Sequence, residues 1–267
     1  MASDGLKIFL DEAGDAVHSV NTTCIGLAGV AEGVTTKPPD MHISWSSKAP
    51  ETAARRARHF VLSGSLVFVQ ESLLEYLRSL RSGAGDNAPL CAALDRKKAA
   101  ERIGAIGSLL PDANAYWAPL VVLLVHWRNR VVHRSNATLG TADRRTLYEN
   151  RQDIASNHAG IDVCLTLRNF EQRKITLKDF TTLIAVTIRF VRYIDDTFAP
   201  GITTVEQFKE ELRRKNLSDR FHSILQANGD HVKQRKITNF IRTEFPSIGG
   251  DLIEQIFEKR DEVVSNA

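Results

Sequence analysis

Two long stretches of the chain repeat apolar residues at helical spacing, and this periodicity restricts the fold more than any other feature. One stretch runs from Leu177 to Phe198. The other runs from about Thr52 to Arg81, and its apolar residues lie mostly three or four positions apart: Phe60, Leu66, Phe68, Val69, Leu73, Leu74 and Leu77. Side chains at that spacing share one face of an α-helix. Both stretches therefore predict long helices whose apolar faces pack against other elements.

The first fifty residues show a different pattern. Residues 6–10 and 23–30 are short apolar runs that predict two strands, because turn-forming residues (Asp-Glu-Ala-Gly-Asp) lie between them. Prolines and scattered serines between Gly33 and Pro50 predict a loop or extended arm. Residues 1–50 are therefore expected to form a small β-hairpin followed by an arm.

Shorter helices are predicted over the following segments: about 90–110, a segment starting near Asn114, 142–158, 205–215, 218–228 and 250–264. The chain as a whole is predicted to be mainly α. The hairpin and arm would occupy residues 1–50, a helical bundle 51–200, and a helical C-terminal appendage 201–267.

The composition adds few constraints. With 267 residues, of which 43% are hydrophobic, the chain can bury a substantial core. Its formal net charge of +3 permits contact with nucleic acid without arguing for it. The three cysteines form no C-x-x-C pair, so neither a disulfide framework nor a cysteine zinc site is expected. The longest apolar run, Ala118 to Val125, is too short to cross a bilayer. A cytoplasmic protein without a membrane contact is expected.

A polar run ends the apolar segment that begins near Asn114, and it reads His-Trp-Arg-Asn-Arg-Val-Val-His-Arg over residues 126–134. Histidine transfers protons near neutral pH. Arginine neutralises phosphate through its rigid fork of donors, and asparagine can orient either group. Arg128, Asn129 and His133 are therefore candidates for the metal-free cleavage of RNA.

An ideal helix over this segment carries one continuous polar stripe, made of His126, Asn129, Arg130 and His133. An unpaired buried polar group costs about 1–3 kcal/mol, so the stripe must face water, a ligand or another subunit. Arg128 lies about 140° around the helix from His133. It joins the stripe only if its side chain bends around the helix, if the last turn loosens, or if a second helix supplies another copy. This mismatch favours a site shared between two helices.

The same residues also suit a purely structural role. The run would then be the solvent-facing end of a core helix, and its basic residues would complement the negative end of the helix dipole. The residues alone leave both interpretations open.

The segment from Arg128 to His133 resembles the R-[N/D/H]-x-x-x-H motif of the HEPN superfamily. In that family the motif lies on a long helix of a helical bundle, and another long amphipathic helix precedes it. Residues 52–200 match this context. The resemblance implies a HEPN-like bundle and a metal-independent endoribonuclease without a cofactor. Two protomers would place their motifs face to face, so that RNA is cleaved only in a homodimer.

The resemblance also implies a role for each residue. His133 would act as general acid and base while the RNA 2′-hydroxyl attacks the adjacent phosphate. Arg128 would stabilise the developing negative charge, and Asn129 would orient the histidine or the phosphate. The products would be a 2′,3′-cyclic phosphate and a 5′-hydroxyl. His126 and Arg130 are expected to contact RNA from outside the consensus.

Two further expectations rest on the same family. Glu71 interrupts the apolar helix over residues 52–81, where family members often carry a polar residue near the cleft, and it is expected to contact the substrate. Proteins of this kind often act as effectors in toxin–antitoxin or phage-defence systems, so an antitoxin or sensor is an expected partner. Residues 203–267 are the candidate contact for that partner.

Two other functions remain open. A HEPN-like bundle could keep the motif without cleaving RNA and serve as a binding module. Alternatively, the segment from Phe9 to Asp15, which contains Asp11 and Glu12, resembles the opening of an RNase-H-like family. In that fold, clustered carboxylates at a strand end hold Mg²⁺ for phosphodiester hydrolysis. The same acids also suit a hydrated turn.

Overall fold

The computed structural model describes residues 3–43, 49–84, 87–110, 113–198, 202, 204–245, 248, 250–260 and 263. Within these residues the chain is helical and contains no strand, which confirms the prediction of a mainly α fold. The chain divides after Phe198 into two compact units. Each unit has its own apolar core.

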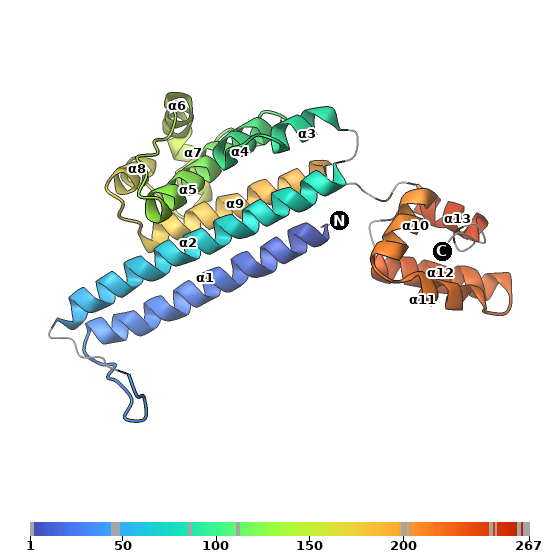
Figure 1. The fold of residues 1–267 in the computed structure, drawn as a ribbon, viewed down its shortest axis with the longest axis horizontal. Helices are drawn as coiled ribbons and strands as arrows, with labels where there is room; N and C mark the ends of the chain where they lie inside the picture. Colours follow the sequence, from blue (N-terminus) through green and yellow to red (C-terminus); the bar gives the residue numbers. More distant parts are fainter. Residues whose placement is uncertain are drawn as a thin grey trace. The chain divides into compact units, whose positions relative to one another are not determined.

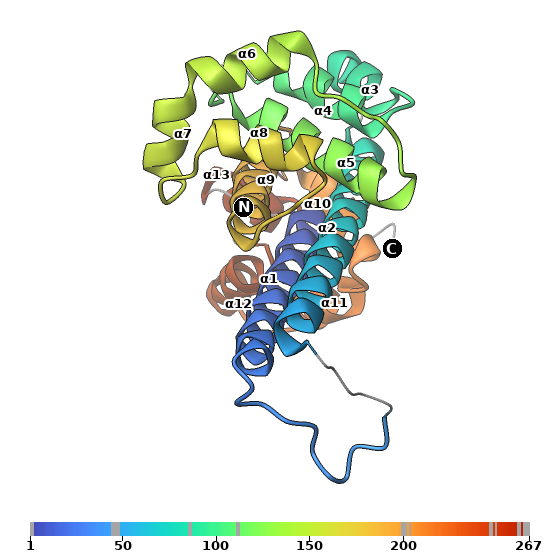
Figure 2. The same cartoon turned by 90° about the vertical axis from the view of Figure 1, so that its left-hand side faces the viewer.

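Four long helices form the bundle of the first unit: α1 (Asp4–Ala31), α2 (Pro50–Gly83), α5 (Trp117–Val132) and α9 (Leu177–Phe198). Helix α2 contacts each of the other three, and α9 also contacts α1 and α5 (Figures 1 and 2). The predicted bounds of α9 are confirmed, and α2 extends the predicted helix by about two residues at each end.

The β-hairpin predicted for the N-terminal residues is wrong, because residues 4–31 form the single helix α1. Its buried residues recur every three or four positions: Leu6, Phe9, Ala13, Ala16, Val20 and Cys24. The acids interpreted as a turn, Asp11 and Asp15, lie on the exposed face of this helix. Near the start of α1, a Cβ added to Gly5 would lie 2.8 Å from Ser79 Oγ of α2, so the glycine permits close approach. Packing against α2 therefore overrides the turn-forming character of Asp-Glu-Ala-Gly-Asp.

Shorter helices complete the first unit: α3 (Ala88–Leu94), α4 (Ala99–Gly107), α6 (Thr141–Glu149), α7 (Arg151–Asn157) and α8 (Val163–Glu171). The helix predicted over 90–110 is thus split into α3 and α4, and the one predicted within 142–158 into α6 and α7. Helices α6, α7 and α8 lie together over α5 and α9, on the side away from α1 (Figures 1 and 2).

The junction between α8 and α9 is fixed by the buried carboxylate of Asp179, which is 2% exposed. It accepts hydrogen bonds from Thr166 Oγ1 at 2.8 Å and from Asn169 Nδ2 at 2.9 Å, both on α8. It also accepts bonds from the backbone nitrogen and the hydroxyl of Thr176, at 3.0 and 2.7 Å. The Thr176 hydroxyl accepts a bond from the Asp179 amide in return, which makes a reciprocal cap at the start of α9.

A second buried carboxylate, Asp195, joins three helices. It accepts a hydrogen bond from the backbone nitrogen of Ser3 at 2.8 Å, and Tyr76 Oη of α2 donates to it at 3.3 Å. Burial raises the pKa of the Tyr76 hydroxyl, and the neighbouring Asp195 charge raises it further. The start of α1 is therefore held against α2 and α9.

The second unit contains α10 (Val205–Arg214), α11 (Ser218–Leu225), α12 (Asp230–Glu244) and α13 (Gly250–Glu258). Aromatic rings fill its core, with Phe208 5.2 Å from Phe245 and 5.4 Å from Phe221 between centroids. Helix α12 is not among the predicted helices. Most of its residues are polar, and only Ile237, Phe240 and Ile241 are buried.

Helix α2 is the one helix in the described part of the chain that is long and apolar enough to cross a membrane. Half of its most apolar window is buried inside the bundle. That buried half packs against α1, α5 and α9, as expected of a core helix.

Candidate active site at the end of helix α5

Three of the predicted site residues meet at the C-terminal end of α5, and Arg128 connects them. Its Nη1 lies 2.8 Å from His133 Nε2 and donates to Asn129 Oδ1 at 3.4 Å. Its Nη2 donates to Glu71 Oε1 of α2 at 2.7 Å, which makes an ion pair. The structure therefore brings Arg128, Asn129, His133 and Glu71 into one group.

The end of the helix explains how Arg128 and His133 meet despite their positions around it. Helix α5 ends at Val132, and His133 leaves the helical path with φ −99° and ψ 1°. Its amide still donates to Asn129 O at 3.0 Å. The long Arg128 side chain bends around this last turn and reaches the imidazole within one chain. The ideal-helix mismatch is thus no longer an argument for a site shared between two helices.

The contact between Arg128 and His133 orients the imidazole. A guanidinium only donates hydrogen bonds, so Nε2 of His133 faces a donor in this contact. A general base uses a ring nitrogen in this way, as the acceptor from the group that it deprotonates.

Arg128 itself is held from the bundle side. Its side chain is 18% exposed, and that of Glu71 is 47% exposed. Its Nε is buried and has no acceptor among the described residues. A buried unpaired donor costs about 1–3 kcal/mol.

His126 lies apart from this group. It is half-buried, and its Nδ1 is buried without a partner in the described part of the chain. Burial lowers the pKa of His126, while the negative charge of Asp143 on α6 opposes that shift. The structure therefore places His126 toward α6, and no hydrogen bond between described residues joins it to His133.

Arg130, which is predicted to contact RNA, is 9% exposed and bound to the protein. Its Nε donates to Ala137 O at 2.7 Å, and its Nη1 donates to Phe170 O at 2.8 Å and Glu171 O at 3.2 Å. Its guanidinium carbon lies 3.9 Å from the centroid of the Phe170 ring. Helix α8 covers this side of α5, so Arg130 joins α5 to the end of α8.

Exposed apolar side chains flank the group on both helices. Phe68 lies one turn before Glu71 on α2 and is 48% exposed. Val131 and Val132 lie close to one turn after Arg128 on α5 and are 37% and 45% exposed. The periodicity of residues 52–81 predicts a buried position for Phe68. The exposure of all three side chains leaves an apolar rim beside the polar group.

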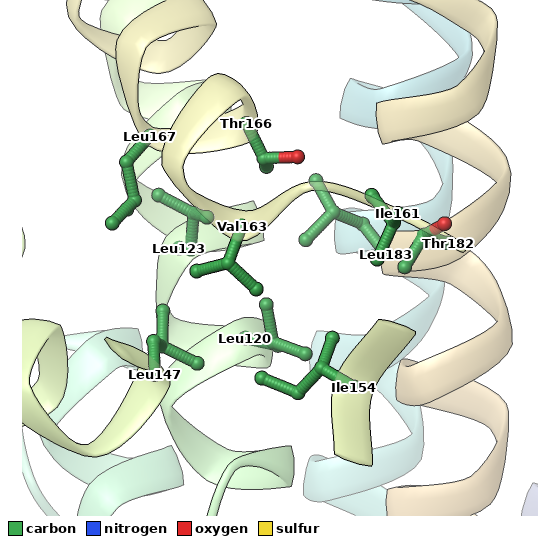
Figure 3. A pocket seen from close by; sticks show the side chains of 10 residues that line it. All are labelled: Leu120, Leu123, Leu147, Ile154, Ile161, Val163, Thr166, Leu167, Thr182 and Leu183. Carbon is green, nitrogen blue, oxygen red and sulfur yellow. The ribbon is translucent and has the colours of Figure 1, made fainter. Parts of the chain in front are cut away.

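Neither a metal cluster nor a ligand-sized core cavity accompanies these residues. In the described part of the chain, no three His, Cys, Asp or Glu side chains gather as metal ligands. The alternative Mg²⁺ site made of Asp11, Glu12 and Asp15 also required a strand, but these residues lie on helix α1. A void between α5, α6, α7, α8 and α9 has a volume of about 10 Å³ and an almost wholly apolar lining (Figure 3). It has room for at most about one water molecule.

Comparison with known proteins gives no further lead. No family model, no curated protein and no solved structure matches the chain. The function is therefore inferred from the residues, their geometry and the motif resemblance.

Proposed function

We propose that this protein is a metal-independent endoribonuclease of the HEPN type. The observation that carries the proposal is the contact of Arg128 with both His133 and Asn129, at the exposed end of α5. It joins an imidazole, which can act as a base, to a permanent cation, and metal-free RNA cleavage requires both groups. Glu71 supports the arrangement by orienting Arg128 from α2.

The chemistry follows from these groups. The RNA 2′-hydroxyl replaces Arg128 as the donor to His133 Nε2, and Arg128 turns to the phosphate. His133 takes the hydroxyl proton while the 2′-oxygen forms a bond to phosphorus. The bond from phosphorus to the 5′-oxygen breaks, and that oxygen receives a proton from an imidazolium. The negative charge that develops on the phosphate oxygens is stabilised by Arg128.

A second copy of the chain supplies the protonating imidazolium in this proposal. The Nε2 atom of one His133 cannot donate a proton in the same step in which it accepts one. The apolar rim formed by Phe68, Val131 and Val132 supports a homodimer, because these exposed side chains beside the polar group gain from burial. Facing copies would place two motifs across one cleft.

The direct test is cleavage of total RNA in EDTA, with wild type compared against His133→Ala. Cleavage that survives EDTA in the wild type and disappears in the variant is expected. His222→Ala is the matched control, because it removes a histidine of the second unit and should cleave normally. Cleavage that EDTA abolishes, or that His133→Ala retains, would overturn the proposal.

One observation favours a second function, a binding module that keeps the motif without cutting. Glu71 already pairs with Arg128 at 2.7 Å, and this neutralises charge that a phosphate would need. On that account, purified wild type would form dimers and bind RNA without cleaving it. Glu71→Gln would then strengthen RNA binding.

The biological setting is proposed on the family resemblance alone. An RNase of this kind would act as a toxin or phage-defence effector and would be restrained by an antitoxin or sensor. The second unit, α10 to α13, is the candidate contact for that partner.

A further inference from the structure

We propose that a basic surface beside the candidate active site binds the backbone of single-stranded RNA. The basic surface consists of Arg56, His59, Arg134, Arg173 and Lys174, all of which are exposed. It rests on the proposed function in that the bound strand would lead into the site at His133. The proposal also names the residues that bind the strand at positions distant from the reacting phosphate.

Hydrogen bonds bring three distant segments of the chain together at this surface. His59 Nε2 of α2 donates to Arg173 O, just beyond α8, at 3.1 Å. Arg173 Nη2 donates to Ser135 O and to Asn136 Oδ1 in the loop after α5, each at 3.2 Å. Arg134 directly follows His133 in that loop. The N-terminal half of α2, the end of α8 and the end of the motif thus form one continuous surface.

The charge on this surface is not neutralised by the protein. Among the described residues no carboxylate pairs with Arg56, Arg134, Arg173 or Lys174. The acids close in sequence are already used, since Glu51 pairs with Arg55 at 3.3 Å and Glu171 with Arg144 at 2.8 Å. An excess of positive charge remains, and a polyanion is the complementary partner.

Backbone geometry supports a role for Arg134 beyond folding. Arg134 and Arg173 both adopt left-handed backbone conformations, with φ of 49° and 56°. Glycine is favoured at such positions after a helix end, and other residues are strained there. The Arg173 side chain compensates by its hydrogen bonds to the loop. The exposed Arg134 side chain has no hydrogen-bond partner in the described part of the chain, so it is available to a phosphate of the strand.

An exposed aromatic ring favours a single strand over a duplex. Phe60 is 78% exposed and lies one turn from Arg56 on α2. Exposed aromatic rings among cations bind unpaired bases by stacking. From His59 to Glu71 the helix rises about 18 Å, so the surface has room for a short run of nucleotides leading to Arg128.

The test measures binding of a fluorescein-labelled, mixed-sequence single-stranded RNA by anisotropy, in the full chain carrying His133→Ala so that RNA stays intact. Each cation that neutralises a phosphate of a single strand contributes about 0.7 to the slope of log affinity against log salt. Arg134→Gly and Arg56→Gln should each lower that slope by about 0.7 between about 50 and 200 mM salt. Arg134→Gly also relieves the strained backbone, so its Tm should not fall.

Two control variants separate this surface from general charge and strain effects. Ala159→Gly relieves a left-handed residue of φ 51° without a change of charge. Lys97→Gln removes an exposed cation between α3 and α4. Both should keep the wild-type slope. The proposed role of the basic surface would be overturned if Arg134→Gly and Arg56→Gln left the salt slope unchanged. It would also be overturned if Lys97→Gln lowered the slope as much as they do. Arg134-dependent binding to phosphatidylserine vesicles without binding to RNA would overturn it as well.

The failure of this inference is distinguishable from the failure of the proposed function. If wild type cleaves RNA in EDTA through His133 but Arg134→Gly and Arg56→Gln keep the slope, the basic surface is wrong and the ribonuclease stands. If both variants lower the salt slope while the wild type never cleaves RNA, the basic surface binds RNA and the proposed ribonuclease activity is wrong.

Discussion

Replacement of Arg130 by alanine separates a structural role from a substrate contact, because the two roles predict different losses. Arg130 is 9% exposed and donates to Ala137 O at 2.7 Å and to Phe170 O at 2.8 Å. Its guanidinium carbon also lies 3.9 Å from the Phe170 ring centroid. Alanine removes all of these contacts and leaves carbonyl groups without their donors.

The size of the loss follows from these contacts. A hydrogen bond from a charged donor contributes about 1.5–3 kcal/mol, so the two short bonds contribute about 3–6 kcal/mol. The contact with the ring adds about 1 kcal/mol. Burial lowers the pKa of Arg130, which shows that desolvation opposes these gains. A net loss of about 3–4 kcal/mol is expected, which lowers Tm by about 10 °C for a unit of this size.

Thermal unfolding followed by circular dichroism measures this loss. Arg145→Ala is the matched control, because the Arg145 side chain is 77% exposed and its removal should change stability by less than about 0.5 kcal/mol. A Tm for Arg130→Ala within the error of the control would refute the structural role. Unchanged Tm with weaker RNA binding would instead restore Arg130 as a substrate contact.

The remaining predictions concern two other buried groups. Asp179→Ala removes the acceptor of four hydrogen bonds at the α8–α9 junction and should cost about 3 kcal/mol; an unfolding midpoint in urea equal to that of wild type would contradict this. His158 is 6% exposed, and burial, aided by Arg189, lowers its pKa. The folded state therefore resists protonation, so the stability from His158 is complete above about pH 6.5 and decreases as pH falls below that value. The fall in Tm from about pH 8 to about pH 5.5 should be smaller in His158→Gln than in wild type. An equal fall in both proteins would show that His158 does not contribute to the pH dependence of stability.

Periodicity predicted the long helices because each buries one continuous face. The bounds of α9 and the body of α2 follow from apolar residues spaced three or four positions apart. The same rule applied to α1 would have found Leu6, Phe9, Ala13 and Ala16. It failed there because small and turn-forming residues contribute little to an apolar pattern, and only contact with α2 makes Ala13 a core residue.

The sequence suggested which residues could form the candidate site, but it could not predict how they are arranged. An ideal helix places Arg130 and His133 on one stripe, yet α8 covers Arg130 while His133 lies beyond the last helical residue and is exposed. Both outcomes depend on elements distant in sequence. The meeting of Arg128 with His133 depends on where α5 ends, and helix ends are the least regular part of a periodic pattern.

The chemistry of the RNA ends tests the central claim most directly. Wild type is incubated with RNA in EDTA, and the fragments are offered to polynucleotide kinase without prior phosphatase treatment. Attack by the 2′-hydroxyl leaves 2′,3′-cyclic phosphate ends and 5′-hydroxyl ends, and the kinase labels the 5′-hydroxyl ends. His133→Ala should yield neither kind of end. Fragments with 5′-phosphate ends that form only with Mg²⁺ would contradict the account.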